Sequence, residues 1–257
     1  MKISIVTVCL NAAATIRDAV ESVAAQRYPD IEHIVIDGVS TDGTLELLKS
    51  SNGRAIRLVS EKDEGLYDAM NKGAGLCTGE VIGFLNADDV YASDHVIAKV
   101  VHCFEKPSID ACYGDLEYVA KDDIRKTVRR WKSGEFRKGS FAKGWVPPHP
   151  GFFVKRGNFR RAGGFNTSLK LAADNDLMMR LLESYGIRAV YIPEVLVKMR
   201  TGGATNKSLS NILRGNLEIL QALRANKVPH NVMSYAFNKG LTRAMQFFHS
   251  GSSGLCT

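Results

Sequence analysis

The chain has 257 residues, enough for one large domain that buries a core without the help of disulfide bonds. Apolar residues make up 45% of the sequence and charged residues 24%, an ordinary globular profile that excludes a disordered chain. The formal charge of +7 is concentrated, because residues 125–143 hold eight basic side chains and one acid and so account for the whole surplus.

The first half of the chain alternates strand and helix patterns. Residues 2–10 form a nearly continuous β-branched run, which predicts a strand covered on both faces. Asn11 follows as the expected cap of a helix whose apolar residues recur at helical spacing over 16–23. The alternation continues with predicted strands at 33–36, 56–59 and 81–85, and with predicted helices at 44–49, at 67–76 and, capped by Ser93, up to about 104. This order predicts an α/β fold with a mostly parallel sheet and helices on both faces.

From about residue 112 the pattern changes to short strands that surround the basic stretch. Strands are predicted at 111–119, 127–131, 151–154 and 188–192, with a helix at 174–185. Leucine and isoleucine residues at helical spacing then predict an amphipathic helix over 209–223, and a last helix is expected over 237–248. The sequence shows neither repeats nor a low-complexity linker, so we expect one compact unit.

Cysteine usage and the N-terminus suggest a compartment. The five cysteines are odd in number and form no CxxC pair, which argues against a disulfide framework or zinc ribbon and predicts reduced thiols. The first apolar run is too short for a signal peptide, and no window approaches the roughly 18 apolar residues of a membrane helix. We therefore expect a cytoplasmic protein, with or without contact to a membrane surface.

Polar clusters follow the predicted strands at the carboxyl edge, where sheets of this class bind ligands. Asn86, Asp88 and Asp89 come directly after the strand at 81–85. Adjacent carboxylates at a strand exit can hold a hard divalent cation, although the same residues also favour a turn with a helix cap. Asp37 ends the strand at 33–36 and either accepts hydrogen bonds from a nucleoside or is a plain turn residue.

A second acidic group, Asp174 and Asp176, opens the helix predicted at 174–185. Residues i and i+2 do not share a helix face, so the two carboxylates have different roles. Asp176 lies four residues before Arg180, the spacing of an ion pair along a helix. Asp174 is either an N-cap or a general base that the helix N-terminus keeps ionised. Spacing alone leaves both readings open.

The basic stretch carries aromatic residues, namely Trp131, Phe136 and Phe141, with Trp145 just beyond it. Such a stretch could bind nucleic acid through its charges and rings, lie against an anionic membrane surface, or form a solvated surface loop. His149 lies among prolines and is either a metal ligand or a loop residue. The sequence contains no GxSxG, GxxxxGK or GxGxxG motif, which argues against a nucleophile elbow, a P-loop and a Rossmann glycine turn.

Together these motifs resemble family 2 glycosyltransferases, the inverting, nucleotide-sugar-dependent enzymes with a GT-A fold. Residues 4–11 (SIVTVCLN) resemble the family's first strand, and residues 33–44 (HIVIDGVSTDGT) its VDDGSTDGT segment, with Gly38 where many members have a second Asp. Residues 60–73 (SEKDEGLYDAMNKG) closely resemble a run of the polysaccharide-synthesis branch related to colanic-acid transferases. Residues 79–89 (GEVIGFLNADD) resemble the metal-binding strand exit, with Asn86 in place of the first acid.

Two later segments resemble the acceptor half of the same family, namely residues 147–153 (PPHPGFF) and 163–180 (GGFNTSLKLAADNDLMMR). Asp174 falls on the family's catalytic-base position, and Ala173 replaces the usual acid before it.

The resemblance covers about residues 2–206 and implies a domain organisation. It implies a GT-A domain over 1–206, with a nucleotide-sugar-binding half (1–110) and an acceptor half (111–206), followed by a C-terminal helical extension over 207–257.

The resemblance also implies the roles of individual residues. The implied nucleotide-binding residues are Thr7, Asn11, Asp37, Asp63, Lys72 and Asp88. Asp88 and Asp89, with His149 as a further contact, are implied to hold Mg²⁺ or Mn²⁺ against the diphosphate of the donor. Asp174 is implied to be the general base, which takes the proton of the acceptor hydroxyl while that oxygen attacks the anomeric carbon and inverts it.

Our hypothesis from the sequence is a transferase that moves a hexose from a nucleotide sugar, a UDP-sugar, to a surface-glycan or polyprenyl-diphosphate-linked saccharide acceptor. The basic stretch 125–143 would hold it against the anionic inner face of the plasma membrane, and we expect no nucleic-acid partner. A nucleotidyltransferase would need a glycine-rich loop that residues 8–13 (VCLNAA) do not supply. A non-catalytic nucleotide-binding subunit of a glycan-assembly complex is the other alternative, and retention of Asp88, Asp89 and Asp174 argues against it.

Overall fold

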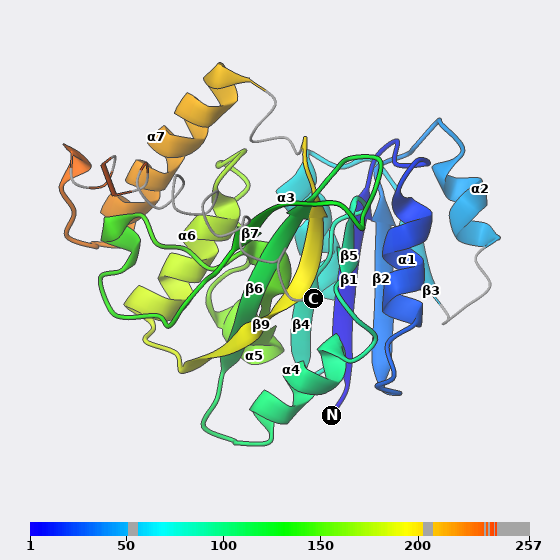
Figure 1. Cartoon of the computed structure of the whole chain (residues 1–257), viewed down its shortest axis with the longest axis horizontal. Coiled ribbons are helices and arrows are strands. Elements are labelled where there is room, and N and C mark those ends of the chain that lie inside the picture. The colour runs from blue at the N-terminus through cyan, green and yellow to red at the C-terminus, as the bar shows by residue number, and fades with distance from the viewer. Residues whose placement is uncertain (51–55, 203–207, 234, 236, 239, 241–257) are drawn as a thin grey trace, which may run out of the picture.

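The computed structural model describes residues 1–50, 56–202, 208–233, 235, 237, 238 and 240. Most of the helix expected over 237–248, and Cys256, lie outside the described residues. A nine-stranded sheet runs through the molecule in the order β3-β2-β1-β4-β8-β6-β9-β5, with β7 paired to β6 (Figure 1). Among the described residues, none of the helices has the length and hydropathy that a membrane span requires.

The nucleotide-binding half expected from the sequence forms a parallel block. Its strands are β1 (Ile3–Cys9), β2 (Ile31–Asp37), β3 (Ile56–Ser60) and β4 (Val81–Phe84). The connecting helices are α1 (Ile16–Ala24), α2 (Thr44–Lys49) and α3 (Leu66–Leu76), close to the predicted ranges. Cys9 pairs with Asp37, and Asp37 with Ser60, so three strands end together at one edge of the sheet.

The rest of the chain extends this block into a mixed sheet, in which β6 and β9 pair in parallel and the other pairs are antiparallel. β8 (Phe152–Lys155) runs antiparallel between β4 and β6 (Ala111–Val119), and the remaining strands are β5 (Asp89–Tyr91), β7 (Thr127–Trp131) and β9 (Ala189–Arg200). The helices are α4 (Val96–Phe104), α5 (Arg156–Arg161), α6 (Ala173–Met179), which a π-helical turn η3 (Arg180–Ser184) continues, and α7 (Leu209–Ala225). Two short 3₁₀ turns, η1 (Phe141–Lys143) and η2 (His149–Gly151), complete the chain order. β5 was not predicted because three residues are too few to show a period, and α5 was not predicted because Phe159 is its one buried residue, so no apolar spacing marks it.

Two predicted helix caps are wrong, because each helix begins further along the chain than predicted. α1 begins after Thr15, while Asn11 adopts a left-handed backbone (φ 52°) and accepts the Thr41 N–H at 2.9 Å. α4 begins after His95, and its first turn is bonded by the side chain of Gln26, which accepts the Ile97 N–H at 3.0 Å. A cap supplied from a loop 71 residues away leaves no local signal in the sequence.

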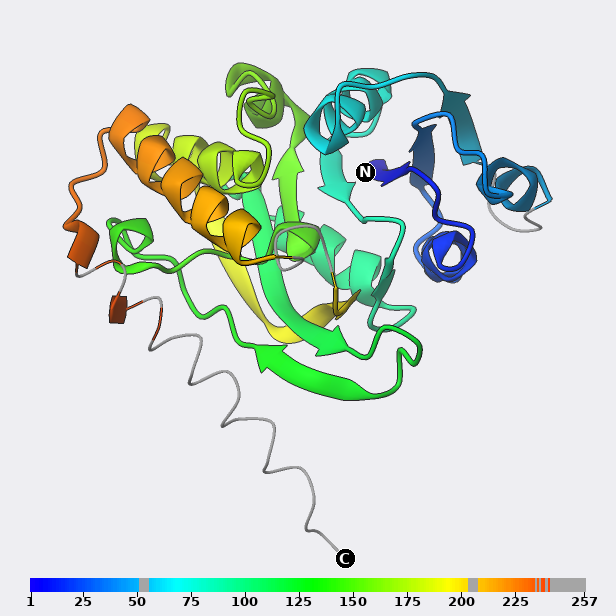
Figure 2. The ribbon, with the colours of Figure 1, turned by 90° about the horizontal axis from the view of Figure 1, so that it is seen from above.

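Helices cover both faces of the parallel block, as predicted (Figure 2). Ile3 and Ile5 of β1 share a core cluster with α4, while Val6 shares another with α3, as the alternation of a strand requires. A Cβ atom at Gly73 would lie 2.4 Å from Val6 Cγ1. Glycine therefore lets α3 approach β1 closely, and α3 carries the residues that follow the loop after β3.

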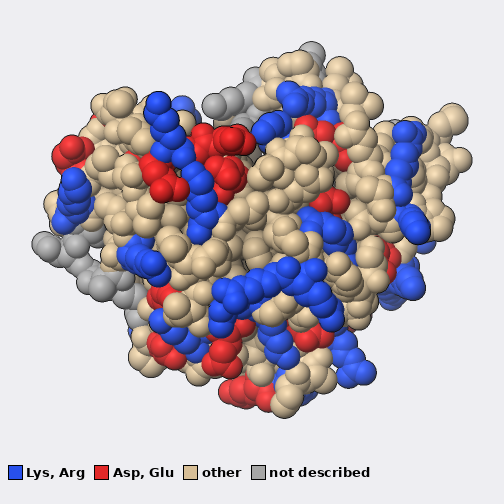
Figure 3. Space-filling model, turned by 180° about the vertical axis from the view of Figure 1, so that it is seen from behind, with Lys and Arg blue, Asp and Glu red and all other residues tan. Residues whose placement is uncertain are grey.

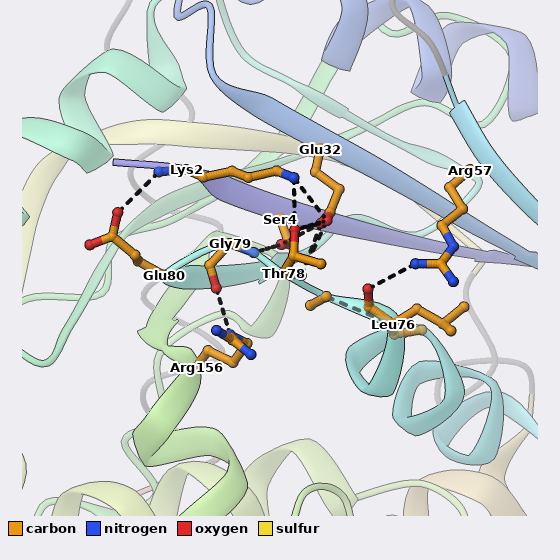
Figure 4. A network of polar contacts seen from close by, with 11 residues as sticks. Lys2, Ser4, Glu32, Arg57, Leu76, Thr78, Gly79, Glu80 and Arg156 are labelled. Carbon is orange, nitrogen blue, oxygen red and sulfur yellow. Dashed lines mark hydrogen bonds and ion pairs between the residues drawn. The ribbon is translucent and has the colours of Figure 1, made fainter.

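The amino ends of the strands are closed by a polar network (Figure 4). Glu32 accepts the Thr78 N–H at 3.0 Å and pairs with Lys2 at 3.4 Å, while Ser4 Oγ accepts the Gly79 N–H at 2.9 Å. Arg156 donates to the Gly79 carbonyl at 2.7 Å and thereby joins α5 to this edge. The loops that carry the predicted site residues lie at the opposite, carboxyl edge.

Candidate active site

Asp37 organises the loop that follows β2. Its carboxyl group is fully buried and accepts the Ser40 N–H at 3.1 Å and the Ser60 hydroxyl at 2.7 Å. Burial raises the pKa of Asp37, but the hydrogen bonds from Ser40 and Ser60 outweigh it and hold the pKa below its ordinary value. The ionised side chain is occupied within the protein and fixes the loop between β2 and α2.

The loops after β1 and β2 are joined into one wall. The Asn11 N–H donates to Ser40 Oγ at 2.8 Å, and Asn11 Oδ1 accepts the Thr41 N–H. Asn11 itself is exposed at this edge. Thr7, in contrast, is fully buried within β1 and bonded to His33 Nε2 at 3.0 Å, so its side chain belongs to the interior of the sheet.

Asp63 lies against Gly38, the position after β2 at which the chain departs from the family motif. A Cβ atom at Gly38 would lie 2.6 Å from Asp63 Oδ2, so the Asp63 carboxylate fills the space that a side chain at position 38 would take. Its other oxygen accepts the Gly65 N–H at 2.9 Å. Asp63 therefore brings a carboxylate from the loop after β3 to the end of β2, where the motif lacks its second acid.

Lys72 binds groups of its own chain. Its ammonium group pairs with Glu61 at 3.1 Å and Asp68 at 3.4 Å and donates to the Lys62 carbonyl at 2.5 Å. The hydrogen bond with Glu61, followed by that with Asp68, raises the pKa of Lys72. The side chain fastens the loop around Asp63 to α3.

The β4 exit places Asp88 at the same edge. Asp88 is half-buried, and among the described residues no hydrogen bond or ion pair engages its carboxylate. Its carbonyl accepts from Arg200, which pairs with Asp18 of α1 and is itself buried. Arg200 therefore fixes the backbone at Asp88 from the end of β9. The sequence reading missed it, because a lone arginine in a strand pattern carries no signal of this kind.

Asp89 and His149, the other two predicted metal ligands, have polar atoms buried beside the β4 exit, namely Asp89 Oδ1 and His149 Nε2. Asp89 is fully buried in β5 and accepts from Asn86 Nδ2 at 3.2 Å, and burial, with Asp88 nearby, raises its pKa well above the ordinary range. The His149 ring stacks on Phe84, its Nε2 atom is enclosed, and burial lowers its pKa. Within the described ranges, no group of three His, Cys, Asp or Glu side chains could hold a metal.

The oxygen atoms that remain at the β4 exit still suit a hard cation. Asn86 Oδ1 is buried and has no hydrogen-bond partner among the described residues, and the Asp88 carboxylate is equally unengaged there. Carboxylate and amide oxygens are the ligands that Mg²⁺ and Mn²⁺ prefer. Asp88 and Asn86 therefore offer oxygen ligands that fit a divalent metal, and Asp89 Oδ1 is a further buried oxygen without a hydrogen-bond partner in the described part of the chain.

Asp174 is brought from the second half of the chain to the start of α3. The Tyr67 hydroxyl donates to Asp174 Oδ1 at 3.0 Å, and Asn175 Nδ2 donates to the same oxygen at 3.1 Å. Burial, followed by the negative charge of Asp174, raises the pKa of Tyr67 well above its ordinary range, so the hydroxyl stays a donor. Asp176 is buried and pairs with Arg180 at 2.8 Å, which confirms that the two carboxylates differ in role.

A chain of aromatic contacts connects Asp174 to the β4 exit. Tyr67 packs on Phe165 with ring centroids 5.5 Å apart, and Phe165 contacts both His149 and Phe84 of β4. Tyr67 was not among the predicted site residues, although it stands in the quoted motif at 60–73. A tyrosine in a helical pattern reads as core, and only the fold places its hydroxyl against Asp174.

The aromatic residues of the basic stretch are largely packed into the protein. Trp131 stacks on Tyr118, and Trp145 lies against Phe141 and donates from Nε1 to the Ser133 carbonyl at 2.6 Å. Arg129 is buried over the Tyr118 ring. The other basic residues of the stretch are exposed, namely Arg125, Lys126, Arg130, Lys132, Arg137, Lys138 and Lys143.

Positive charge also gathers on a second face. Figure 3 shows a band of Lys and Arg side chains across the middle of the side opposite the view of Figure 1, in the region of α5. α5 contributes Arg156, Arg160 and Arg161, of which the last two are exposed. The basic stretch 125–143 is therefore not the only basic surface of the molecule.

Comparison with known proteins identifies relatives for most of the chain. Residues 4–170 match the family described as Glycosyl transferase family 2. A PGL/p-HBAD biosynthesis glycosyltransferase of Mycobacterium bovis is 31% identical over 208 residues, which cover 79% of this chain and 78% of the relative.

Solved structures show the same fold. The mannosyltransferase PcManGT from Pyrobaculum calidifontis, in complex with GDP-Man and Mn²⁺, superposes with a TM-score of 0.66 at 20% identity and covers 99% of this chain and 76% of its own. TarS residues 1–349 of S. aureus, in complex with UDP-GlcNAc, superpose with a TM-score of 0.67 at 16% identity, covering 99% of this chain and 75% of their own. The α/β, GT-A fold predicted from the sequence is confirmed.

Proposed function

The chain belongs to glycosyl transferase family 2, and from this premise we propose that it moves a hexose from a UDP-sugar to a surface-glycan or lipid-linked saccharide acceptor, with inversion at the anomeric carbon. The observation that carries this proposal is the hydrogen bond between Tyr67 and Asp174. It joins a candidate base of the acceptor half to the helix that follows the donor loops, at the carboxyl edge where sheets of this kind bind ligands.

The donor would lie along the wall formed by the loops after β1, β2 and β3. Asn11 and Asp63 offer their polar groups at this wall, whereas Asp37 and Lys72 hold its loops in place. A carboxylate such as Asp63 accepts hydrogen bonds from the N–H groups of a nucleobase or from ribose hydroxyls. TarS is solved with UDP-GlcNAc and PcManGT with GDP-Man, so the nucleotide is a point for experiment.

Asp88 and Asn86 would hold a divalent metal at the β4 exit. When bound, such an ion neutralises the charge that develops on the leaving nucleoside diphosphate. Arg200 keeps the Asp88 backbone in place through its carbonyl.

Asp174 would act as the general base. Tyr67 and Asn175 both donate to Oδ1, which leaves Oδ2 to accept the proton of an incoming hydroxyl. The deprotonated oxygen attacks the anomeric carbon as the bond to the nucleoside diphosphate breaks, and one displacement inverts the configuration. His149 is enclosed among Phe84 and Phe165, so we give it a packing role beside the base.

Thermal unfolding with UDP, GDP, CDP or TDP, each with and without Mn²⁺, tests the donor site, because a ligand that binds only the folded protein raises its stability. We expect a Mn²⁺-dependent rise with UDP, and a larger rise with GDP would overturn the choice of nucleotide. Asp174→Asn should abolish sugar transfer and retain the nucleotide-dependent rise. Transfer that survives in this variant would refute the base, and a wild-type protein that binds UDP but transfers no sugar would favour a non-catalytic subunit.

We place a membrane contact at the end of the molecule formed by α7 and the segment around η1 (Figures 1 and 2). On α7, Leu213 and Leu217 are 65% and 61% exposed. Beyond it, Met233 and Phe237 are 83% and 73% exposed. Exposed apolar side chains beside basic ones suit an anionic bilayer surface. The packed tryptophans leave the charges of the basic stretch, rather than its rings, to take part.

Flotation with vesicles of anionic or neutral lipid tests this contact. Leu213→Ser with Leu217→Ser should weaken binding to anionic vesicles, and Arg137→Ser with Lys138→Ser should weaken it in a salt-dependent way. Arg160→Ser with Arg161→Ser removes two exposed charges from α5 and serves as the matched control. Equal loss in all three variants, or no binding by the wild type, would refute the assigned surface.

A further inference from the structure

Helix α6, which carries Asp174, begins without a capping side chain of its own. The residue before it is Ala172, and Ala173 stands where the family resemblance expects an acid. The backbone N–H groups at a helix start have no partner within the helix and need an acceptor from elsewhere. Both alanines are buried, so water does not supply that acceptor readily.

A carboxylate from α7 accepts the N–H groups of the N-cap residue Ala172 and of the residue before it. Glu218 Oε2 accepts the Leu171 N–H at 2.7 Å and the Ala172 N–H at 3.1 Å, across 47 and 46 residues of chain. Glu218 is 6% exposed, and its other oxygen accepts from Arg214 Nε at 3.1 Å. A charged side chain this deeply buried is retained only where its partners engage both oxygens.

We propose that Glu218 is a positioning residue for the base Asp174 and supplies, from α7, the acid that this chain lacks at position 173. The inference rests on the proposed role of Asp174. Glu218 fixes the backbone two residues before Asp174, and Tyr67 fixes the carboxylate itself. α7 is thus part of the catalytic unit, although it lies beyond the residues that match the family.

A second link between α6 and α7 provides a matched control. Asn226 Nδ2 donates to Asp176 Oδ1 at 3.0 Å, and Ser184 donates to Asn226 Oδ1 at 3.1 Å. This link also joins the two helices, but it engages Asp176 rather than the backbone before the base. Loss of either link should loosen the helix pair, and only loss of Glu218 should misplace the base.

The test compares Glu218→Ala, Glu218→Gln and Asn226→Ala in the full chain, with kcat and the donor Kd measured separately. A displaced base costs about tenfold or more in rate, so Glu218→Ala should lower kcat by about that factor and leave the donor Kd within about twofold. Glu218→Gln should recover most of kcat, because its amide oxygen still accepts both N–H groups. Asn226→Ala should lower the melting temperature and keep kcat within about twofold.

Two results would overturn the proposal: an unchanged kcat in Glu218→Ala, or an equal fall in Asn226→Ala. Should Glu218→Ala fail to fold, Glu218→Asp withdraws the carboxylate by one methylene and should show the same loss of kcat. Asp174→Asn is measured alongside. If that variant remains active, the base assignment fails, whereas an inactive Asp174→Asn with a fully active Glu218→Ala refutes the role of Glu218 alone.

Discussion

Replacing Tyr67 by phenylalanine tests how the base is held. The substitution removes one oxygen atom, the donor that lies 3.0 Å from Asp174 Oδ1. The ring is 7% exposed and packs on Phe165, and phenylalanine keeps both features. The change therefore isolates one hydrogen bond to a half-buried carboxylate.

The expected size of the effect follows from that hydrogen bond. A hydrogen bond to a charged group contributes about 1.5–3 kcal/mol. Asn175 still donates to the same oxygen at 3.1 Å, so we take the lower value, about 1.5 kcal/mol. The Tyr67 hydroxyl stabilises the ionised form of the carboxylate, so its removal disfavours that form. A free-energy change of about 1.36 kcal/mol corresponds to one pH unit. The acid limb of the kcat profile should therefore move to higher pH by about one unit.

The assay is release of the nucleoside diphosphate in the presence of acceptor, measured between about pH 4 and pH 9, with donor Kd determined in parallel. Tyr185→Phe is the matched control, because the Tyr185 hydroxyl donates to the Arg161 carbonyl away from the site. An acid limb that stays in place in Tyr67→Phe, with normal folding, would refute the idea that this hydroxyl supports the ionised base.

Three further substitutions test the remaining assignments. Asp88→Asn should abolish the Mn²⁺-dependent rise in melting temperature with nucleotide. Asp89→Asn should retain this rise, because the Asp89 side chain is buried against Asn86. Loss of the rise in Asp89→Asn alone would reverse the assignment of the metal ligand. Asp37→Asn tests the loop after β2. The pKa of Asp37 in the folded protein lies below the ordinary value of 3.8, so its contribution to stability is present above that pH and is lost as the pH falls through the folded-state pKa. The variant should lose about 1–3 kcal/mol at about pH 7 and very little near pH 2, measured by thermal unfolding. An equal loss at both pH values would contradict the role of the ionised carboxylate.

The parallel half of the fold could be predicted from the sequence because its signals are local. β-branched runs mark buried strands, and apolar residues at helical spacing mark the helices between them. The predicted ranges at 44–49, 111–119 and 127–131 agree with the observed elements. The caps could not be predicted in the same way. Gln26 bonds the start of α4 from the loop after α1, and no residue near position 96 predicts this bond.

The residues of the candidate site could likewise be predicted only in part from local signals. Motif spacing predicted Asp88 and Asp174 as candidate site residues, and the structure places Asp174 against the start of α3. Spacing could not separate residues that face the donor from residues that hold the loops. Thr7 and Asp37 look like ligands in a motif, and both are fully buried with their polar atoms bonded inside the protein.

The departures from the family motif follow a physical pattern. Gly38 lacks the second acid of its segment, and the carboxylate of Asp63 fills the space that a side chain there would need. Ala173 lacks the acid before the base, and Glu218 brings a carboxylate to the same helix start. In each case a carboxylate from elsewhere in the chain lies next to the altered position. A missing acid in a sequence motif is therefore not by itself evidence against function. It becomes evidence only when no other carboxylate lies near that position in the folded protein.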